Sequence, residues 1–156
     1  MAHADPSTLY RLTYVSTAVG VLPASELDRI LLRSRISNAG SDVTGLLLFH
    51  EGSFLQVIEG PAAGVMALME KIRRDRRHAN VQVLESSPVS ARAFAGQPLS
   101  YLAPRHLTAE DRTDLAGLLA VARANFAPKP TPAHDLVTRL WCFLAAFRNL
   151  EPAVAR

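Results

Sequence analysis

The sequence predicts one α+β domain in which a single sheet carries two helices on the same face. First, 156 residues with 49% hydrophobic and 20% charged residues are usual for one folded domain. Second, the spacing of apolar residues alternates between the period of two that is typical of strands and the longer period of helices. Third, these segments follow the order strand, helix, strand, strand, helix, strand, which is that of a ferredoxin-like sheet.

The first half of this pattern contains three strands and one helix. Residues 9–16 alternate in part and are rich in Tyr, Thr and Val, which favours a strand. Residues 24–39 carry apolar side chains at helical spacing and predict an amphipathic helix. Residues 43–50 and 53–59 are apolar runs separated by a Glu-Gly pair, an arrangement typical of an antiparallel hairpin.

A second helix and two further strands complete the predicted sheet. Pro61 suits the start of a helix because no backbone donor is needed there, and the apolar stripe that follows predicts a helix that ends near Asp75. Residues 81–85 return to the strand pattern. After a corner that contains Gly and Pro at 96–98, residues 99–102 predict a short edge strand.

The residues after Pro104 predict a pair of helices that extends the sheet domain. One helical pattern covers 108–125, three prolines follow it, and 133–149 carry a wide apolar band. Either the bare face of the sheet or a second subunit must cover that band. We therefore divide the chain into an arm (1–8), the sheet domain (9–104), a helical extension (105–150) and a tail (151–156).

Composition excludes several classes of protein. The net charge of +3 is only a weak indication of an anionic partner. The single Cys142 excludes an intramolecular disulfide and a thiolate-rich metal site, and no apolar stretch has membrane-spanning length. We therefore expect a cytoplasmic protein that contacts no membrane and holds no metal. Four histidines have no short metal-ligand spacing and are expected at the surface: His3, His50, His106 and His134.

Polar residues continue the inward-facing stripe of the first helix. Steps of three and four residues from Leu27, Ile30 and Leu31 reach Ser34 and Asn38. A buried amide without a partner costs about 1–3 kcal/mol. Asn38 therefore requires either protein partners or a ligand. The alternative is a helix C-cap, because Asn and Gly are common where helices end.

The first and third predicted strands also carry polar side chains toward the helices. Phe54, Gln56 and Ile58 share one face, so Gln56 stands between two large apolar neighbours. On the first strand Tyr14 brings a hydroxyl that needs a partner when buried. Because these strands are neighbours in a ferredoxin-like sheet, we expect Tyr14 and Gln56 to meet beneath the helices. Apolar walls with a few hydrogen-bonding groups and no acid, base or nucleophile are typical of a binding pocket. The alternative is a mutually satisfied core pair.

Four blocks of sequence together resemble a known family. They are LTYVS at 12–16, NAGSDVTGLLLF at 38–49, EGSFLQVIEG at 51–60 and RRDRRHANVQVL at 73–84. Over about residues 9–102 the chain resembles the BLUF family, which are blue-light sensors using FAD. The resemblance implies that the domain of residues 9–104 is a photoreceptor rather than an enzyme. It also implies a noncovalent FAD whose ring lies between the two helices, with FMN or riboflavin as alternatives.

The resemblance assigns roles to the residues at matching positions. Tyr14 and Gln56 match the pair that hydrogen-bonds near flavin N5 and O4, and Asn38 matches the amide at the pyrimidine edge. We further expect Arg77 and His78 to contact the exposed phosphate tail. The other matches are a pocket hydroxyl, a basic contact near the C2 carbonyl and two aliphatic side chains on the ring faces: Ser34, Lys71, and Ile30 with Ile72.

The mechanism that the resemblance implies is a switch of hydrogen bonds. Light makes the flavin a stronger oxidant, Tyr14 gives it an electron and a proton, and on return Gln56 is left in a rotated or tautomeric form. A carboxamide has a donor and an acceptor end, so its reversal exchanges which end meets the flavin. The output is then a conformational population shift. We expect it to pass through a homodimer or larger assembly, or to an unidentified protein effector.

Three positions depart from the family pattern. After ARAFAG the family often has a Trp and, two residues later, a Met that are thought to relay the change through the last strand. This chain has Gln97 and Leu99 at those positions. Leu99 keeps the volume but loses the flexible thioether, and Gln97 offers a polar contact in place of an indole. Ser37 also stands where the family frequently has a second Asn or a His.

Two other functions compete with the sensor. The basic tract at 71–78 suggests nucleic acid, but cations suit the solvated C-terminal end of a helix. A nucleic-acid module of this fold would need exposed stacking aromatics in a pattern that EGSFLQV does not supply, so we do not expect nucleic acid as a partner. A flavin-dependent redox enzyme is the other alternative, but the sequence offers no nicotinamide site or redox Cys pair. Trp141 and Cys142 are expected to serve packing.

Overall fold

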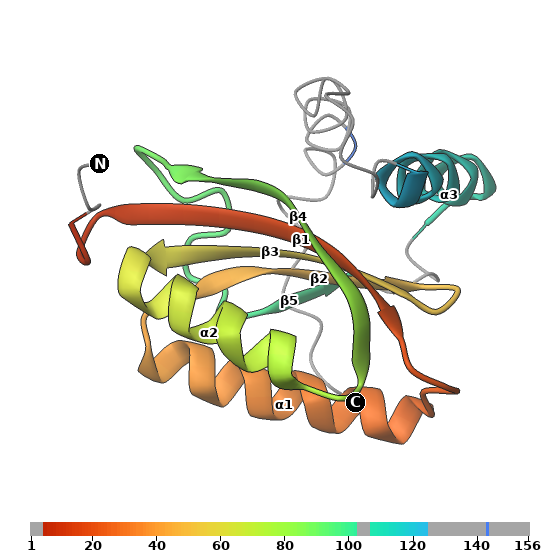
Figure 1. Cartoon of the computed structure of the whole chain (residues 1–156), viewed down its shortest axis with the longest axis horizontal. Helices are drawn as coiled ribbons and strands as arrows, with labels where there is room; N and C mark the ends of the chain where they lie inside the picture. The colour runs from red at the N-terminus through yellow and green to blue at the C-terminus, as the bar shows by residue number, and fades with distance from the viewer. Residues whose placement is uncertain (1–4, 103–106, 125–142, 144–156) are drawn as a thin grey trace.

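The computed structural model of the chain describes residues 5–102, 107–124 and 143. Within these residues the α+β class and the predicted order of elements are confirmed (Figure 1). The elements are β1 (Leu9–Ala18), α1 (Ala24–Gly40), β2 (Thr44–His50), β3 (Ser53–Pro61), α2 (Ala62–Arg74), β4 (His78–Pro88), β5 (Ser100–Leu102) and α3 (Ala109–Ala124).

The five strands form one sheet in the order β4-β1-β3-β2-β5. Strand β1 runs antiparallel to both β3 and β4, and β2 runs antiparallel to β3. The short β5 pairs parallel with β2 at the edge of the sheet, which confirms the predicted edge strand and adds its direction and partner. The ferredoxin-like order therefore places β1 and β3 at the centre, where Tyr14 lies directly opposite Gln56.

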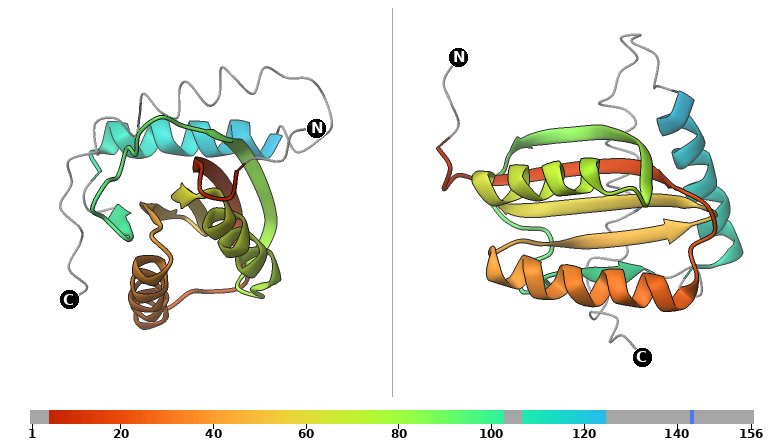
Figure 2. Two further views of the ribbon diagram at one scale, coloured as in Figure 1. Left: turned by 90° about the vertical axis from the view of Figure 1, so that its left-hand side faces the viewer. Right: turned by 60° about the horizontal axis from the view of Figure 1, so that its bottom comes forward.

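Helices cover both faces of the sheet. Helices α1 and α2 lie side by side on one face and α3 lies across the other (Figures 1 and 2). Because side chains alternate along a strand, Tyr14 packs with residues of α2, whereas its neighbour Val15 packs with Leu115 and Leu119 of α3. The first helix after residue 104 thus covers the bare face. The predicted helix at 133–149 lies outside the described residues except for Phe143, which packs against the same cluster as Val15.

Strands β1, β3 and β4 extend beyond their predicted bounds because pairing across the sheet lengthens them. Strand β4 covers His78–Pro88 rather than 81–85, because it pairs with β1 from His78 through Pro88. Helix α1 begins after Pro23 with no side-chain cap, and it ends at Gly40 with Ser41 as the C-cap.

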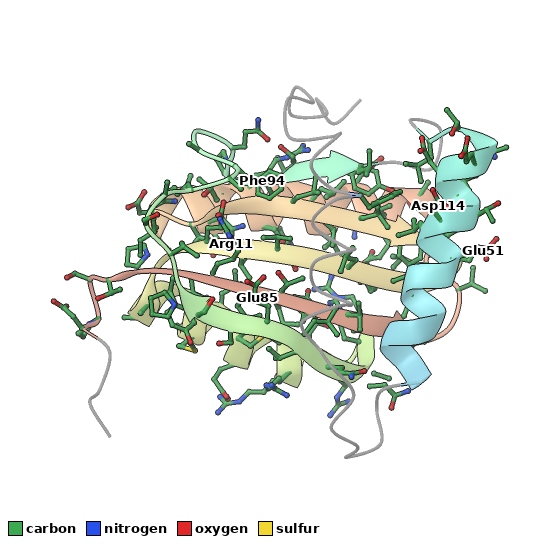
Figure 3. All side chains as sticks on the ribbon, turned by 90° about the horizontal axis from the view of Figure 1, so that it is seen from above. Arg11, Glu51, Glu85, Phe94 and Asp114 are labelled. Atoms are coloured by element: carbon green, nitrogen blue, oxygen red, sulfur yellow. The ribbon has the colours of Figure 1, made fainter. Side chains whose placement is uncertain are left out.

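A buried carboxylate anchors the loop between β4 and β5. Glu59 of β3 is fully buried and accepts a hydrogen bond from Arg11 Nε at 2.9 Å. The backbone amides of Ala93 and Phe94 each donate to it at 2.9 Å. Figure 3 looks onto the face of the sheet that α3 covers, with Arg11 and Phe94 labelled. Because Phe94 is itself buried in the cluster beneath α3, the loop is fixed on both the polar and the apolar side before the chain enters β5.

Candidate functional site

Tyr14 and Gln56 form a buried hydrogen-bonded pair at the centre of the sheet. Both side chains point toward α1 and α2, and their exposed fractions are 0% and 6%. Tyr14 Oη donates to Gln56 Oε1, which confirms the predicted meeting of the two side chains. With Oε1 facing the phenol, the Nε2 group of Gln56 is the donor end that is left for a ligand.

The buried position keeps Tyr14 in its protonated form. Removal from water raises the pKa of the Tyr14 phenol well above its ordinary value, and the nearby carboxylate of Asp75 raises it further. The phenol is therefore neutral at physiological pH and acts as the hydrogen-bond donor of the pair.

A cleft between α1 and α2 opens onto this pair. Ile30 comes from α1 and Ile72 from α2, so the two helices provide the facing aliphatic side chains. Such apolar walls with a small number of convergent polar groups are typical of ligand sites. The lining residues besides Tyr14 and Gln56 are Ile30, Ser34, Asn38, Leu47, Phe54, Leu68, Ile72, Asp75, Arg77, His78 and Leu99.

Asn38 lines the cleft and also holds the chain before β5. Its side chain is 2% exposed, and its Nδ2 donates to the carbonyl of Pro98 at 2.9 Å. The C-cap alternative is wrong, because α1 continues to Gly40 and ends at the cap residue Ser41. Since Nδ2 is used by Pro98, the acceptor Oδ1 is the end of the amide that suits an N–H donor of a ligand.

Arg77 closes one end of the cleft through ion pairs. Its Nη2 lies 2.6 Å from Asp75 Oδ2, its Nε lies 3.0 Å from Asp75 Oδ1, and its Nη1 lies 3.5 Å from Glu26 of α1. The hydrogen bond from Arg77 lowers the pKa of Asp75, and the same bond raises the pKa of Arg77. Both groups stay charged near neutral pH, and together they link the end of α2 to the start of α1.

His78 lies inside the cleft at the first residue of β4. Its Nδ1 is 2.7 Å from Ser16 Oγ, and its ring centroid is 4.6 Å from that of Phe54 and 6.3 Å from that of Tyr14. Burial lowers the pKa of His78, against the opposing effect of Asp75. The basic tract at 71–78 was predicted to be the solvated end of a helix. This is wrong for His78, because α2 ends at Arg74 and His78 already belongs to strand β4.

The structure brings most of the predicted site residues into one cleft, and two of them lie elsewhere. Lys71 is exposed on α2 and is not among the residues that line the cleft. Gln97 accepts a hydrogen bond from Ser100 Oγ and likewise does not line it. Leu99 is 1% exposed and lines the cleft.

The prediction that His50 lies at the surface is wrong. His50 was expected at the surface and is 8% exposed, because it closes β2 opposite Ser53 in the hairpin. The other three histidines of that prediction lie outside the described residues, as do Trp141 and Cys142.

Sequence reasoning missed three contributors to the site. Arg35 Nε donates to the carbonyl of Leu99 at 2.9 Å, so a second side chain of α1 holds the lead into β5. Asp75 lines the cleft from the turn after α2. Ser16 follows Tyr14 by two residues, so strand alternation alone would have placed it on the same face.

Comparison with known proteins identifies the class and the family of this domain. The fold and the site are those of a flavin-binding sensor domain. The family profile described as "Sensors of blue-light using FAD" matches residues 9–100. The chain belongs to this family, BLUF. It is 31% identical over 144 residues to photoactivated adenylate cyclase subunit alpha of Euglena gracilis, covering 92% of this chain and 14% of that protein.

Solved structures of BLUF proteins share the fold. The dark-state structure of BlrB, a BLUF protein, has a TM-score of 0.70 and 25% identity, covering 92% of this chain and 99% of BlrB. Klebsiella pneumoniae BlrP1, solved with FMN and cyclic diGMP, has a TM-score of 0.64 and 30% identity, covering 88% of this chain and 34% of BlrP1. These likenesses favour a sensor over the redox enzyme and over the nucleic-acid module. Among the described residues, no helix is long and apolar enough to cross a membrane.

Proposed function

We propose that this chain is a blue-light photoreceptor that holds FAD noncovalently between α1 and α2, with Tyr14 and Gln56 as its photoactive pair. The observation that carries the proposal is their hydrogen bond, which is buried at the floor of a cleft that has aliphatic side chains from both helices and further polar groups. A core pair that only satisfied itself would not need a cleft above it, so the geometry favours the ligand site over that alternative.

The chemistry of the cleft fits a flavin. A flat ring with apolar faces suits the aliphatic side chains of Ile30 and Ile72, which come from the two facing helices. Its polar edge suits the amide ends that the protein's own hydrogen bonds leave, the acceptor Oδ1 of Asn38 and the donor Nε2 of Gln56. The remaining residues that we assign to the cofactor are Ser34 in the cleft, Lys71 on the exposed surface of α2 outside the cleft lining, and Arg77 with His78 toward the tail.

The light response then rests on what Tyr14 and Gln56 can do. A bound flavin supplies a strong oxidant when it absorbs blue light. Tyr14 holds its proton on Oη because its pKa is raised, and it donates that proton toward Gln56 Oε1. Rotation or tautomerisation of the Gln56 amide exchanges the end that faces the cleft. Burial of both side chains excludes water, which would otherwise offer them alternative partners.

FAD rather than FMN is supported by the family description and by the mouth of the cleft. Arg77 remains 40% exposed while paired with Asp75, so its guanidinium can contact a phosphate at the protein surface. Flavin released from the purified protein by heat and separated by chromatography should be mainly FAD. A preparation that contains only FMN or riboflavin would contradict this assignment.

We propose that the output passes from the domain of residues 9–104 to an assembly or a protein effector in the cytoplasm. The relatives support this, because their names describe photoactivated or light-regulated adenylate cyclases, and this chain covers only 14% and 35% of two of them. Within this chain, the helical extension of residues 105–150 begins on the far face of the sheet from the cleft, where α3 packs. Gln97 and Leu99 are the positions that we assign to the relay. Light scattering after size-exclusion chromatography should show a dimer or larger species, and a monomer in both dark and light would contradict this.

The decisive experiment is the visible spectrum before and after blue illumination. The parent should be yellow and should show a small red shift that reverses in the dark. Gln56→Leu should keep the flavin and lose the shift, because it removes the amide that changes partners. Gln82→Leu is the matched control, since Gln82 lies on the opposite side of the sheet, and it should respond like the parent. A colourless protein, or a Gln56→Leu variant that still responds, would refute the proposal.

A further inference from the structure

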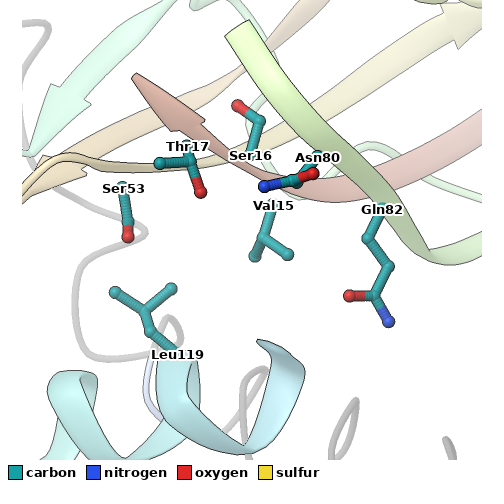
Figure 4. Close-up of a pocket in the computed structure, with 7 residues that line it drawn as sticks. All are labelled: Val15, Ser16, Thr17, Ser53, Asn80, Gln82 and Leu119. Atoms are coloured by element: carbon teal, nitrogen blue, oxygen red, sulfur yellow. The ribbon is translucent and has the colours of Figure 1, made fainter. Parts of the chain in front are cut away.

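A second cavity lies on the other side of the sheet, behind the photoactive pair. It is partly open to solvent and has a volume of about 250 Å³ between strands β1, β3 and β4 and helix α3 (Figure 4). Val15 of β1 and Leu119 of α3 provide its apolar walls. Val15 directly follows Tyr14, so this cavity and the cleft share strand β1 but open on opposite faces.

The cavity contains a buried hydroxyl that has no partner. Ser53 is 2% exposed, and its Oγ makes no hydrogen bond with any described residue. Figure 4 shows this hydroxyl directed toward Leu119, with the hydroxyl of Thr17 beside it. An unpaired buried hydroxyl is destabilising. Because buried polar groups in proteins nearly always have a hydrogen-bond partner, the Ser53 hydroxyl is expected to bond to a molecule that occupies the cavity.

The other polar groups around the cavity are neutral. Asn80 and Gln82 contribute carboxamides from β4 (Figure 4). Each carboxamide can both donate and accept, and so can the hydroxyls of Thr17 and Ser53. None of the described residues that line the cavity is charged. A charged ligand would lose its hydration without gaining a counter-ion, which is unfavourable.

We propose that this cavity binds an uncharged small molecule of about the size of one substituted ring, which carries both a hydrogen-bond donor and an acceptor. The size follows from the volume, since pockets for drug-sized ligands enclose about 300–1,000 Å³. The inference goes beyond the proposed light response and does not depend on it, because every residue that carries it lies on the face opposite the cleft.

Three ring compounds of the same shape and different charge test the proposal. Benzamide is neutral, benzoate is an anion and benzamidine is a cation. Each is titrated into the isotope-labelled full chain in the dark and followed by two-dimensional NMR. Benzamide should shift the backbone amide signals of Thr17, Ser53 and Gln82 saturably, whereas the charged analogues should not. No saturable shift with benzamide, or equal shifts with all three compounds, would overturn the proposal.

Two hydroxyl variants locate the binding. Ser53→Ala should weaken benzamide binding about tenfold, because it removes a buried hydrogen-bonding group. Thr17→Ala should weaken it as well and provides a second measurement if Ser53→Ala folds poorly. Thr13→Val is the matched control, since Thr13 Oγ1 is also buried without a partner but does not line the cavity. Unchanged affinity in both alanine variants, or an equal loss in Thr13→Val, would contradict the assigned site.

Discussion

Replacing Tyr14 by Phe removes one oxygen and leaves the ring in place. Gln56 Oε1, which accepts the phenolic hydrogen bond in a buried position, then loses its donor. An unsatisfied buried acceptor costs about 1–3 kcal/mol. In a chain of this size each kcal/mol lowers the melting temperature by about 2–4 °C. Because Phe has no proton to give, the reversible red shift should also be lost.

Tyr10→Phe is the matched control for this variant. Tyr10 lies on the same strand, and its hydroxyl is 2.9 Å from Ser86 Oγ in an exposed position. Exposed substitutions usually change stability by less than about 0.5 kcal/mol, so this variant should melt close to the parent and keep its light response. Thermal unfolding and the spectrum before and after illumination give both readouts. A Tyr14→Phe variant that still shows the reversible shift, or that is no less stable than Tyr10→Phe, would refute the assigned role of the buried pair.

Three further predictions concern the loop anchor at Glu59, the close approach at Gly45 and the protonation of His78. Glu59→Ala should lower the free energy of unfolding by about 3–5 kcal/mol in urea titrations, because it removes the carboxylate that Arg11 and the amides of Ala93 and Phe94 bind. A decrease of less than about 1 kcal/mol would contradict the anchoring role. Gly45→Ala should prevent stable folding, since its Cβ would lie 1.9 Å from a β3 carbonyl oxygen, whereas Gly40→Ala meets nothing within 4 Å and should be tolerated. Burial lowers the pKa of His78 in the folded state. As the pH falls below about 6.5, the unfolded chain therefore binds the proton before the folded chain does. The free energy of unfolding then decreases by at most about 1.4 kcal/mol per pH unit. His78→Gln should flatten that loss in urea titrations, and an unchanged slope would show that another group causes it.

The sheet could be predicted where the sequence pattern and the tertiary structure agree. Strands β1, β2 and β3 have alternating or wholly apolar patterns, and the hairpin between β2 and β3 follows from them. Strand β4 was predicted too short at both ends. Its last residues, Ser86, Ser87 and Pro88, have low strand propensity and extend the strand only because they pair with β1. Its start at His78 is likewise fixed by pairing with Ala18.

The candidate site could be predicted where a polar side chain interrupts an apolar face. Tyr14, Gln56 and Asn38 each occupy a position where the strand or helix period requires a buried residue, so their burial follows from the sequence. The sequence pattern did not indicate that Asp75 and His78 line the cleft. They lie in and just after the turn that follows α2, where neither the helical nor the strand period of apolar residues applies. The partners of a side chain across the fold also cannot be read from local pattern, since they depend on the sheet order and on the course of the loops.

Three hydrogen bonds to main-chain carbonyls connect α1 and β2 with the segment that leads into β5. Asn38 donates to the carbonyl of Pro98 and Arg35 to that of Leu99, both from α1, while a β2 amide donates to the carbonyl of Gln97 at 3.0 Å. These acceptors are backbone atoms, so they persist whichever side chains stand at 97 and 99. Two of these hydrogen bonds come from α1 and one comes from β2, so residues 97–99 are held beside the cleft from both elements.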